Sequence, residues 1–304
     1  MKPRIVFMGT PEFAVASLRA LVEDGNEVVG VVTTPDKPVG RHGSRLQPSP
    51  VKCFALEQGL PVLQPEKLRD PAFLQALSAW RADLQVVVAF RMLPEVVWAM
   101  PPLGTFNLHA SLLPQYRGAA PINWAIINGE TRTGVTTFLL DQQIDTGRIL
   151  LQEFTPIAPD DTAGTLHDRL MQMGAALVCR TVDLLRTGRA TPVEQKPVGE
   201  LRAAPKLFRD TCRIDWSQSA EQVRNFIRGL SPYPGAWTEL GEGQLKVYES
   251  CLVDGGEGDI GQLAVREGQL LARCADGWLR LTQVQASGKR RMDDATFVRG
   301  WRGC

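Results

Sequence analysis

The sequence has almost no excess of charge and no grouping of cysteines. Among its 304 residues, 34 Lys and Arg face 33 Asp and Glu, which gives a formal net charge of +1. This balance argues against a wholly basic or wholly acidic binding protein, so any contact with nucleic acid would have to come from a local patch. The six cysteines form no Cys-x-x-Cys pair, which indicates neither a zinc cluster nor a disulfide framework. We expect most of them to be buried thiols.

Long apolar runs are also missing. None reaches the roughly 20 residues that a membrane helix needs. The start at Met1–Arg4 leads directly into a short strand in place of the apolar core of a signal peptide. We therefore expect a cytoplasmic protein. The length predicts two domains, and nothing in the pattern requires more than a monomer.

Two common nucleotide-binding motifs are absent as well. The segment Met8–Pro11 lies between an expected strand and an expected helix, where a dinucleotide loop is usually found. It contains no Gly-x-Gly-x-x-Gly, and Pro11 removes a backbone donor. The chain has no Gly-x-x-x-x-Gly-Lys-Ser/Thr segment either. Neither an NAD-dependent enzyme nor a nucleotide hydrolase is indicated.

The first half of the chain alternates short apolar runs with segments of helical periodicity. This alternation is typical of an α/β fold with a doubly wound, mostly parallel, Rossmann-like sheet. Such sheets bind ligands at the carboxyl ends of their strands. Buried strands are predicted at 5–8, 28–32, 86–90, 105–108 and 135–140, with a helix at 122–127.

The second half has a different pattern. A long helix is predicted at 164–185, and the proline-containing segment 189–206 has the composition of a linker. A helix at 220–230 precedes short strands, which predict a small β-barrel. We therefore predict a first domain at 1–188 and a second domain at 207–304. The strands of the second domain are expected at 245–248, 261–265, 270–274 and 278–284.

Reactive polar side chains gather in and after the strand expected at 105–108. Asn107 and His109 are two residues apart, so both side chains leave the same face of an extended segment. Asp145 follows the next strand. An amide, an imidazole and a carboxylate would then meet at one edge of the sheet. Taken singly, an Asn and a His on one strand face are more often structural than catalytic, and Asp145–Gly147 also suits an ordinary turn.

Taken together, these residues resemble the pattern of a known family. With Ser111–Pro114, Asp145–Gly147 and the opening Met8–Ala14, the chain resembles the folate-dependent formyltransferases over nearly its whole length. The resemblance implies catalytic roles for Asn107 and His109, and for the Asp of Asp145–Gly147. It implies transfer of a formyl group from 10-formyltetrahydrofolate, without a metal, to the amino group of initiator methionyl-tRNA for translation initiation. It also implies that the second domain is OB-like and aids tRNA binding.

The residue types suit that chemistry. Attack on a formyl carbon places negative charge on its oxygen, and the Asn107 amide can donate to it, which is typically worth ~2.7 to 4 kcal/mol. The imidazole of His109 can donate as well or exchange protons near neutral pH. Asp145 would either orient the imidazole or accept the proton of the amine through water. The sequence leaves both roles of Asp145 open.

The resemblance also implies a folate pocket with two walls. Ser111, Leu112, Leu113 and Pro114 would line one wall, and Phe90, Met92 and Leu93 the other. Two positions depart from a common family pattern. Many relatives have Tyr-Gly where this chain has Phe90-Arg91, and many have Gly at the position of Gln143.

A basic loop at 37–52 suggests contact with phosphate. No acidic residue occurs between Asp36 and Glu57. A solvated loop would have the same composition, but the resemblance implies that the loop approaches the acceptor end of the tRNA, with Arg41 and Arg45 as the best candidates. Its centre, His42-Gly43-Ser44, is less basic than in many relatives. Cations that could extend the phosphate track across the second domain are Lys206, Lys289, Arg290 and Arg291.

Other functions remain compatible with the sequence. A nucleotide-sugar amine N-formyltransferase would share the same three residues and a similar second domain. An enzyme that formylates glycinamide ribonucleotide usually needs one domain only. A catalytically inert RNA-binding module, or a hydrolase that releases formate without an acceptor, would belong to another class. The basic loop favours the tRNA acceptor.

Overall fold

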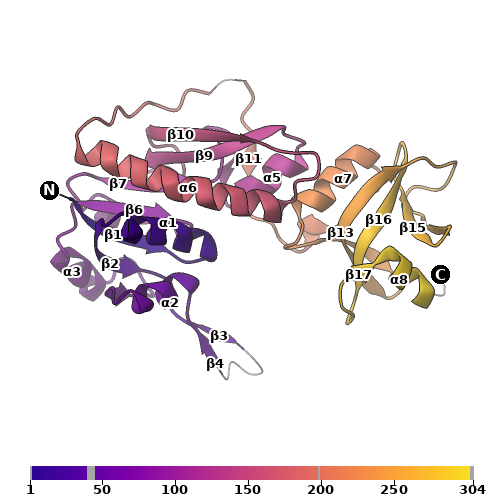
Figure 1. The fold of residues 1–304 in the computed structure, drawn as a ribbon, viewed down its shortest axis with the longest axis horizontal. Helices are drawn as coiled ribbons and strands as arrows, with labels where there is room; N and C mark the ends of the chain where they lie inside the picture. The colour runs from indigo at the N-terminus through magenta and orange to yellow at the C-terminus, as the bar shows by residue number, and fades with distance from the viewer. Residues whose placement is uncertain (1, 40–44, 198, 302–304) are drawn as a thin grey trace. The chain divides into compact units, whose positions relative to one another are not determined.

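The computed structural model describes residues 2–39, 45–197 and 199–301. The chain forms two compact units, and each is drawn from several segments (Figure 1). Unit 1 comprises residues 1–117, 134–155 and 168–202, and unit 2 comprises residues 118–133, 156–167 and 203–304. The expected fold class, a mostly parallel α/β sheet followed by a small β domain, is confirmed.

Unit 1 is built on a seven-stranded sheet in the order β10-β9-β7-β6-β1-β2-β5. Strand β1 pairs in parallel with both β2 and β6, and β7 pairs in parallel with β6 but antiparallel with β9. The sheet is therefore mostly parallel, with a reversed strand beside β7. Its strands are β1 (Arg4–Gly9), β2 (Glu27–Val32), β5 (Val62–Leu63), β6 (Leu84–Val88), β7 (Thr105–His109), β9 (Arg132–Leu139) and β10 (Ile149–Pro156).

Helices cover both faces of this sheet. The helices are α1 (Glu12–Glu23), α2 (Pro50–Glu57), α3 (Pro71–Ala79), α4 (Glu95–Trp98) and α6 (Ala163–Arg186), the last of which contributes to both units. Phe73 and Leu77 of α3 pack in one apolar cluster with Met8 and Val87 of the sheet. On the opposite face, Gly174 of α6 lies against Leu108, where an added Cβ would come within 2.6 Å of a leucine methyl. The sheet is thus doubly wound.

The strand pattern places Asn107 and His109 on a defined face. In the pairing of β6 with β7, Val87 lies opposite Asn107 and Val88 lies opposite Leu108. Paired residues of neighbouring strands point to the same side of a sheet. Asn107 therefore shares the face of Val87, away from α6. The expected strand at 86–90 is too long, because β6 ends at Val88 and Ala89 has a positive φ of 46°.

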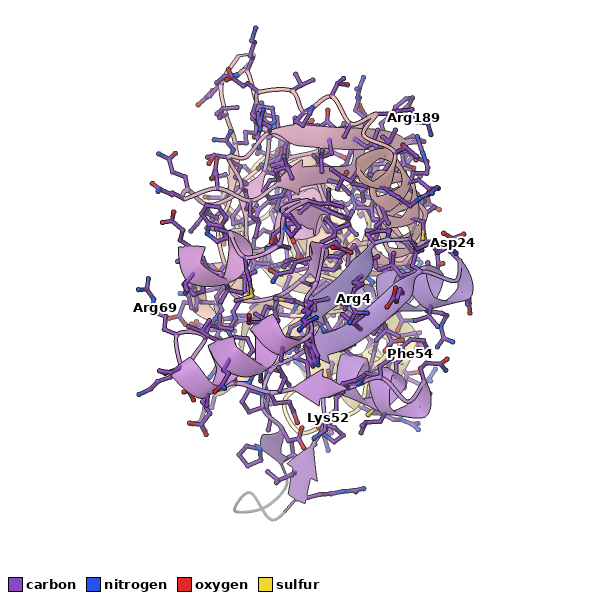
Figure 2. The ribbon with its side chains drawn as sticks, turned by 90° about the vertical axis from the view of Figure 1, so that its left-hand side faces the viewer. Arg4, Asp24, Lys52, Phe54, Arg69 and Arg189 are labelled. Carbon is purple, nitrogen blue, oxygen red and sulfur yellow. The ribbon has the colours of Figure 1, made fainter. Side chains whose placement is uncertain are left out.

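The basic loop expected at 37–52 is a hairpin followed by a helix. Strands β3 (Lys37–Val39) and β4 (Arg45–Gln47) pair antiparallel, and Lys37 lies opposite Gln47. Helix α2 then begins at Pro50, and the hydroxyl of Ser49 caps it by accepting from the backbone N–H of Lys52. Figure 2 shows Lys52 beside the root of this hairpin.

Unit 2 contains the predicted antiparallel strands. Its sheet has the order β12-β13-β16-β15-β14, and β17 pairs with β16. The bounds of its elements are α5 (Pro121–Ile127), β11 (Ala203–Ala204), the 3-10 helix η2 (Asp210–Cys212), α7 (Ala220–Gly229), β12 (Ala236–Leu240), β13 (Gly243–Val253), β14 (Leu263–Arg266), β15 (Gln269–Arg273), β16 (Trp278–Ala286), β17 (Met292–Asp293) and α8 (Asp294–Gly300), while the short β8 (Arg117–Gly118) lies where the two units divide.

Two segments from earlier in the chain are held in unit 2 by hydrogen bonds to α7. The amide of Asn123 in α5 donates to the carbonyl of Gly229 at 2.8 Å. The guanidinium of Arg228 donates to the carbonyls of Ala158 and Asp161 at 3.3 and 3.0 Å. Sequence periodicity cannot report such long-range bonds, so the mixed origin of unit 2 was not predicted.

An ion pair between the buried Asp294 and the partly exposed Arg280 fixes the start of α8. Asp294 is 2% exposed and accepts from Nε and Nη2 of Arg280 at 2.7 and 3.1 Å. Burial by itself raises the pKa of Asp294, but the hydrogen bonds and the charge of Arg280 outweigh it, so the pKa is lowered. Removing Arg280 would leave the buried carboxylate without a counter-charge, although the backbone N–H groups of Leu270 and Ala295 would still donate to it.

The cysteines differ from the expectation. Cys212 and Cys274 are buried, but Cys53 and Cys251 are exposed and Cys179 is partly buried. The expectation of buried thiols was therefore wrong for Cys53 and Cys251. Burial raises the pKa of Cys274 to about 12 and that of Cys179 to about 11. Within the described residues, no helix is long and apolar enough to cross a membrane.

Candidate active site

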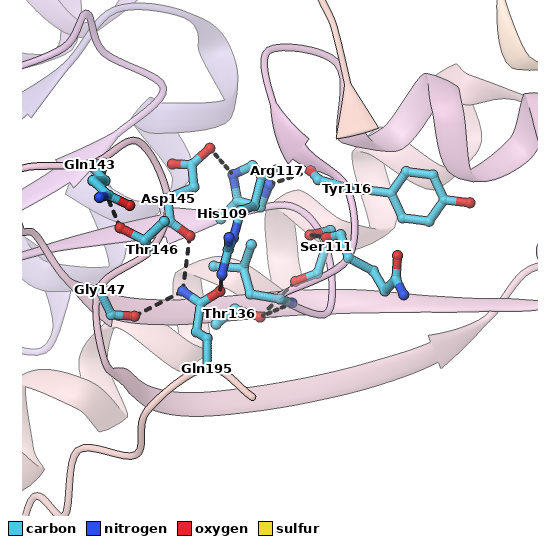
Figure 3. A network of polar contacts seen from close by, with 12 residues as sticks. His109, Ser111, Tyr116, Arg117, Thr136, Gln143, Asp145, Thr146, Gly147 and Gln195 are labelled. Atoms are coloured by element: carbon cyan, nitrogen blue, oxygen red, sulfur yellow. Dashed lines mark hydrogen bonds and ion pairs between the residues drawn. The ribbon is translucent and has the colours of Figure 1, made fainter. Parts of the chain in front are cut away.

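The candidate site lies at the carboxyl end of β7, as the sequence predicts (Figure 3). Phe106 and Leu108 are buried in the apolar layers, whereas Asn107 on the other face is partly exposed. Among the described residues, the Asn107 side chain has no hydrogen-bond partner. Its amide is therefore available to a ligand.

Both ring nitrogens of His109 face oxygen atoms. Nε2 lies 2.9 Å from the backbone carbonyl of Tyr116. A carbonyl can only accept, so Nε2 carries the proton of this bond. Nδ1 lies 3.9 Å from Oδ2 of Asp145, which is an ion-pair distance but too long for a hydrogen bond. The structure thus brings His109 and Asp145 together, with side chains only 7% and 14% exposed.

Asp145 sits in a tight loop between β9 and β10. Its φ is 56°, a conformation that costs a residue with a side chain roughly 1 to 3 kcal/mol. The hydroxyl of Thr146 donates to Asp141 at 2.8 Å. Gly147 passes so close to β9 that an added Cβ would lie 1.6 Å from the carbonyl oxygen of Leu139. The glycine of Asp145–Gly147 is therefore required by packing.

The segment 111–116 is tied to β9 and β10 by polar contacts. The hydroxyl of Thr136, which lies opposite His109 in β9, donates to the carbonyl of Ser111 at 2.6 Å and accepts from the backbone N–H of Leu113 at 3.2 Å. The amide of Gln152 donates to the carbonyl of Leu113 at 2.9 Å. The hydroxyl of Ser111 donates to the carbonyl of Gln115 at 2.6 Å. The Leu113–Pro114 peptide is cis.

Sequence reasoning missed one residue at the centre of these contacts. Gln195, which lies in the predicted linker, donates from Nε2 to the carbonyls of Asp145 and Gly147 at 2.9 and 2.8 Å. Its Oε1 accepts from Nε and Nη2 of Arg117 at 3.1 and 2.7 Å. A lone Gln in a Pro-containing segment gives no sequence signal. Arg117 was visible only as part of the loop that follows Ser111–Pro114.

The residues expected to form the second folate wall differ in exposure. Phe90 is partly buried, Met92 is 74% exposed, and Leu93 is buried in the cluster beneath α3 and α4. Arg91, one of the departures from the family pattern, donates to the carbonyls of Pro65 and Glu66. Burial lowers the pKa of the Arg91 guanidinium.

The expected tRNA-binding cations have varied surroundings. Arg41 lies outside the described residues. Arg45 in β4 is exposed, and Lys206 is exposed with its Nζ 5.5 Å from the ring centre of Phe208. Lys289 and Arg290 are exposed in the turn before β17. Arg291 is committed to an ion pair with Glu249 at 2.6 Å and lies over the ring of Tyr248.

Lys52, another cation of the basic segment, is also paired. Its Nζ lies 2.6 Å from Oδ2 of Asp36, and Gln64 donates to the other carboxylate oxygen at 2.7 Å. Hydrogen bonds from Lys52 and Gln64 lower the pKa of Asp36. Lys52 therefore anchors the root of the hairpin.

Comparisons with known proteins agree on a family. The family profile described as "Formyl transferase" matches residues 3–182, and that described as "Formyl transferase, C-terminal domain" matches residues 206–302. The methionyl-tRNA formyltransferase of Parabacteroides distasonis is 58% identical over 310 residues, which cover 98% of this chain and 96% of that protein. The enzyme of the same name from Bacteroides thetaiotaomicron is 55% identical with the same coverage of both chains.

A solved structure shows the same fold at lower identity. The N-formyltransferase from Helicobacter canadensis, in complex with folinic acid and dTDP-3-aminofucose, has a TM-score of 0.65 and 20% identity to this chain. The match covers 92% of this chain and 99% of that one. The chain therefore belongs to the formyltransferase family, in the group that comprises the methionyl-tRNA formyltransferases.

Proposed function

We propose that this protein transfers a formyl group from 10-formyltetrahydrofolate to the amino group of initiator methionyl-tRNA. The observation that carries the proposal is the identity of 58% to a methionyl-tRNA formyltransferase over 98% of the chain. The grouping of Asn107, His109 and Asp145 at one strand end supports the same reaction. The formylated product would serve translation initiation in the cytoplasm.

Asn107 is proposed to stabilise the charge that develops in the reaction. The amine nitrogen attacks the formyl carbon, and the carbonyl electron pair moves to the formyl oxygen. When that pair returns, the bond between the formyl carbon and the folate nitrogen breaks. The unpartnered, partly exposed amide of Asn107 can donate to the oxyanion, and removing such a donor typically costs ~2.7 to 4 kcal/mol.

His109 and Asp145 are proposed to handle the protons. Because Nε2 of His109 donates to the carbonyl of Tyr116, the nitrogen left for proton exchange is Nδ1, which faces Asp145 at 3.9 Å. When Nδ1 carries a proton, it can donate that proton to the formyl oxygen or to the leaving nitrogen. Asp145 would also accept the proton of the amine, directly or through water.

The folate is proposed to bind between two segments of unit 1. Ser111, Leu112, Leu113 and Pro114 would form one wall, and their backbone is already fixed by Thr136 and Gln152. On the other side, Phe90 and the exposed Met92 offer apolar surface, while the buried Leu93 supports them from the core.

The tRNA is proposed to contact the hairpin and the C-terminal region. Arg41, Arg45, Lys206, Lys289 and Arg290 are the proposed phosphate ligands. Arg291 would have to leave Glu249 to join them, because the pair lies at 2.6 Å. We retain a functional division into a catalytic domain at 1–188, a linker at 189–206 and a tRNA-binding domain at 207–304. The enzyme is proposed to act as a monomer.

The deciding experiment is an acceptor competition. Purified protein with 10-formyltetrahydrofolate is offered methionyl-tRNA, uncharged tRNA and a 4-amino nucleotide sugar in separate reactions, and the formylated product is measured. We expect product only with methionyl-tRNA. Formylation of the sugar would keep the chemistry but overturn the acceptor, and formate release without any formylated acceptor would identify a hydrolase. An absence of any product would favour an RNA-binding module.

A further inference from the structure

One amide side chain joins the two loops that hold the imidazole of His109 (Figure 3). The first loop carries Tyr116, whose carbonyl accepts from Nε2, and the second carries Asp145, which faces Nδ1. Gln195 bonds to the second loop at two carbonyls and to Arg117 directly after the first loop.

The orientation of the Gln195 amide is determined by its partners. Nε2 faces two carbonyl oxygens, which only accept, and Oε1 faces a guanidinium, which only donates. A reversed amide would place oxygen against oxygen and nitrogen against nitrogen at every contact. All four contacts are between 2.7 and 3.1 Å. The hydrogen-bonding capacity of this amide is therefore filled.

The backbone also fixes Gln195 in place. Val193 forms an antiparallel bridge with Ile149 at the start of β10, with N–H to carbonyl distances of 2.7 and 2.9 Å in the two directions. Ile149 follows the loop that ends at Gly147, so the bridge lies next to that loop in the sequence. A segment that composition alone marks as a linker is thus attached to the sheet two residues before Gln195.

The loop that Gln195 holds has a strained backbone at its functional residue. Asp145 has a φ of 56°, and such strain persists only where the surroundings enforce it. Gln195 donates one hydrogen bond to the carbonyl of Asp145 itself and a second to the carbonyl of Gly147, two residues later. Both bonds hold the backbone of this loop. Without them, the loop can relax and carry the carboxylate away from Nδ1.

We infer that Gln195 is a positioning residue for formyl transfer: its amide sets the place of the Asp145 carboxylate against His109 and couples that loop to Arg117. The inference rests on the proposed function, since it concerns the same site. Gln195 itself would touch neither the folate nor the acceptor, and its effect passes through Asp145. A misplacement of a reacting group by about 1 Å can cost ~10²-fold in rate.

Two variants separate the contacts of Gln195 with the Asp145 loop from its contacts with Arg117. Gln195→Leu removes all four hydrogen bonds. Gln195→Glu keeps an acceptor for Arg117 but loses both N–H donors to the loop. We expect kcat to fall roughly 10- to 100-fold in both variants, with KM for methionyl-tRNA and for the folate changed less than about threefold. Glu194→Ala, an exposed neighbour on the same segment, is the matched control.

A spectroscopic measurement tests the positioning without any turnover. The chain has only three histidines, so ring ¹⁵N signals of histidine-labelled protein can be assigned by the loss of one set in His109→Gln. We expect the His109 signals to move in Gln195→Leu and Gln195→Glu and to stay in Glu194→Ala. Circular dichroism and thermal melting check that each variant is folded.

Two results would overturn the inference. In the first, the His109 ring signals and kcat are unchanged in folded Gln195→Leu. In the second, Gln195→Glu behaves as the wild type, which would show that the donors to the loop are dispensable. A wild-type protein that formylates no acceptor would instead refute the proposed function. The ring signals would still report whether Gln195 positions Asp145 against His109.

Discussion

The loops around His109 and the β3–β4 hairpin are both parts of unit 1 for which we propose a functional role, yet they are built in opposite ways. Around His109, several hydrogen bonds join residues far apart in sequence, such as that from Gln195 to the carbonyl of Asp145 and that from Thr136 to the carbonyl of Ser111. Among the described residues of the hairpin, Arg45 is exposed, and Asp36 and Lys52 form an ion pair at its root. Rigid placement suits a reacting group, whereas an exposed cation suits a long, variable polyanion.

The largest effect is expected at the imidazole. His109→Ala should lower kcat by roughly 10²- to 10⁴-fold, because proton transfer near neutral pH is lost. Binding of methionyl-tRNA, measured by filter binding, should remain close to that of the wild type. His167→Ala, on α6, is the control for loss of a histidine. Loss of tRNA binding in His109→Ala would contradict the separation of chemistry from binding.

A smaller but still large effect is expected from Gly147→Ala. The added methyl would lie 1.6 Å from the carbonyl oxygen of Leu139, so the backbone of the Asp145 loop must shift. We expect at least a tenfold loss of kcat and a lower melting temperature. The reason for the loss of kcat is that a displacement of a reacting group by about 1 Å can cost ~10²-fold in rate. Gly256→Ala meets no atom within 4 Å and should leave both quantities unchanged. Wild-type activity in Gly147→Ala would show that the loop tolerates movement.

The hairpin should respond in binding and hardly at all in stability. Arg45→Ala is expected to raise KM for methionyl-tRNA severalfold and to reduce the salt slope of tRNA binding by about 0.9, the value for one lost phosphate contact. Arg69→Ala, an exposed arginine elsewhere on unit 1, is the matched control. Arg41→Ala should act in the same way as Arg45→Ala. Equal damage to folate binding would refute the placement of these arginines on the tRNA.

The smallest effect is expected at the root of the hairpin and depends on pH. Hydrogen bonds from Lys52 and Gln64 lower the pKa of Asp36 in the folded protein. A lowered carboxyl pKa stabilises the fold above the unfolded value of about 3.9, and this contribution is lost as the pH falls through the folded value. The melting temperature of Asp36→Asn should therefore lie below that of the wild type at neutral pH, and the difference should shrink below about pH 4. A difference that is constant with pH would exclude this ion pair as its cause.

Much of the sheet could be predicted because its signals are local. The apolar runs at β1 and β2 are short, and in β7 Asn107 and His109 share a face through the two-residue period of a strand. The sequence misjudged the end of β6, where Ala89 takes a positive φ that no residue type announces. It also missed that the basic loop is a hairpin, because the pairing of Lys37 with Gln47 joins residues that carry no strand pattern.

The amino-acid sequence by itself determined the family, the two kinds of sheet and the shared face of Asn107 and His109 in β7, because these depend on residue type and short-range spacing. Only the tertiary structure decided which atoms surround them. Asp145 takes a positive φ and approaches His109 to 3.9 Å, and Gln195 forms four hydrogen bonds. These contacts join segments up to about 80 residues apart. Such contacts exist only after the chain has buried its apolar faces, since the close packing of the sheet and helices fixes where each loop must pass.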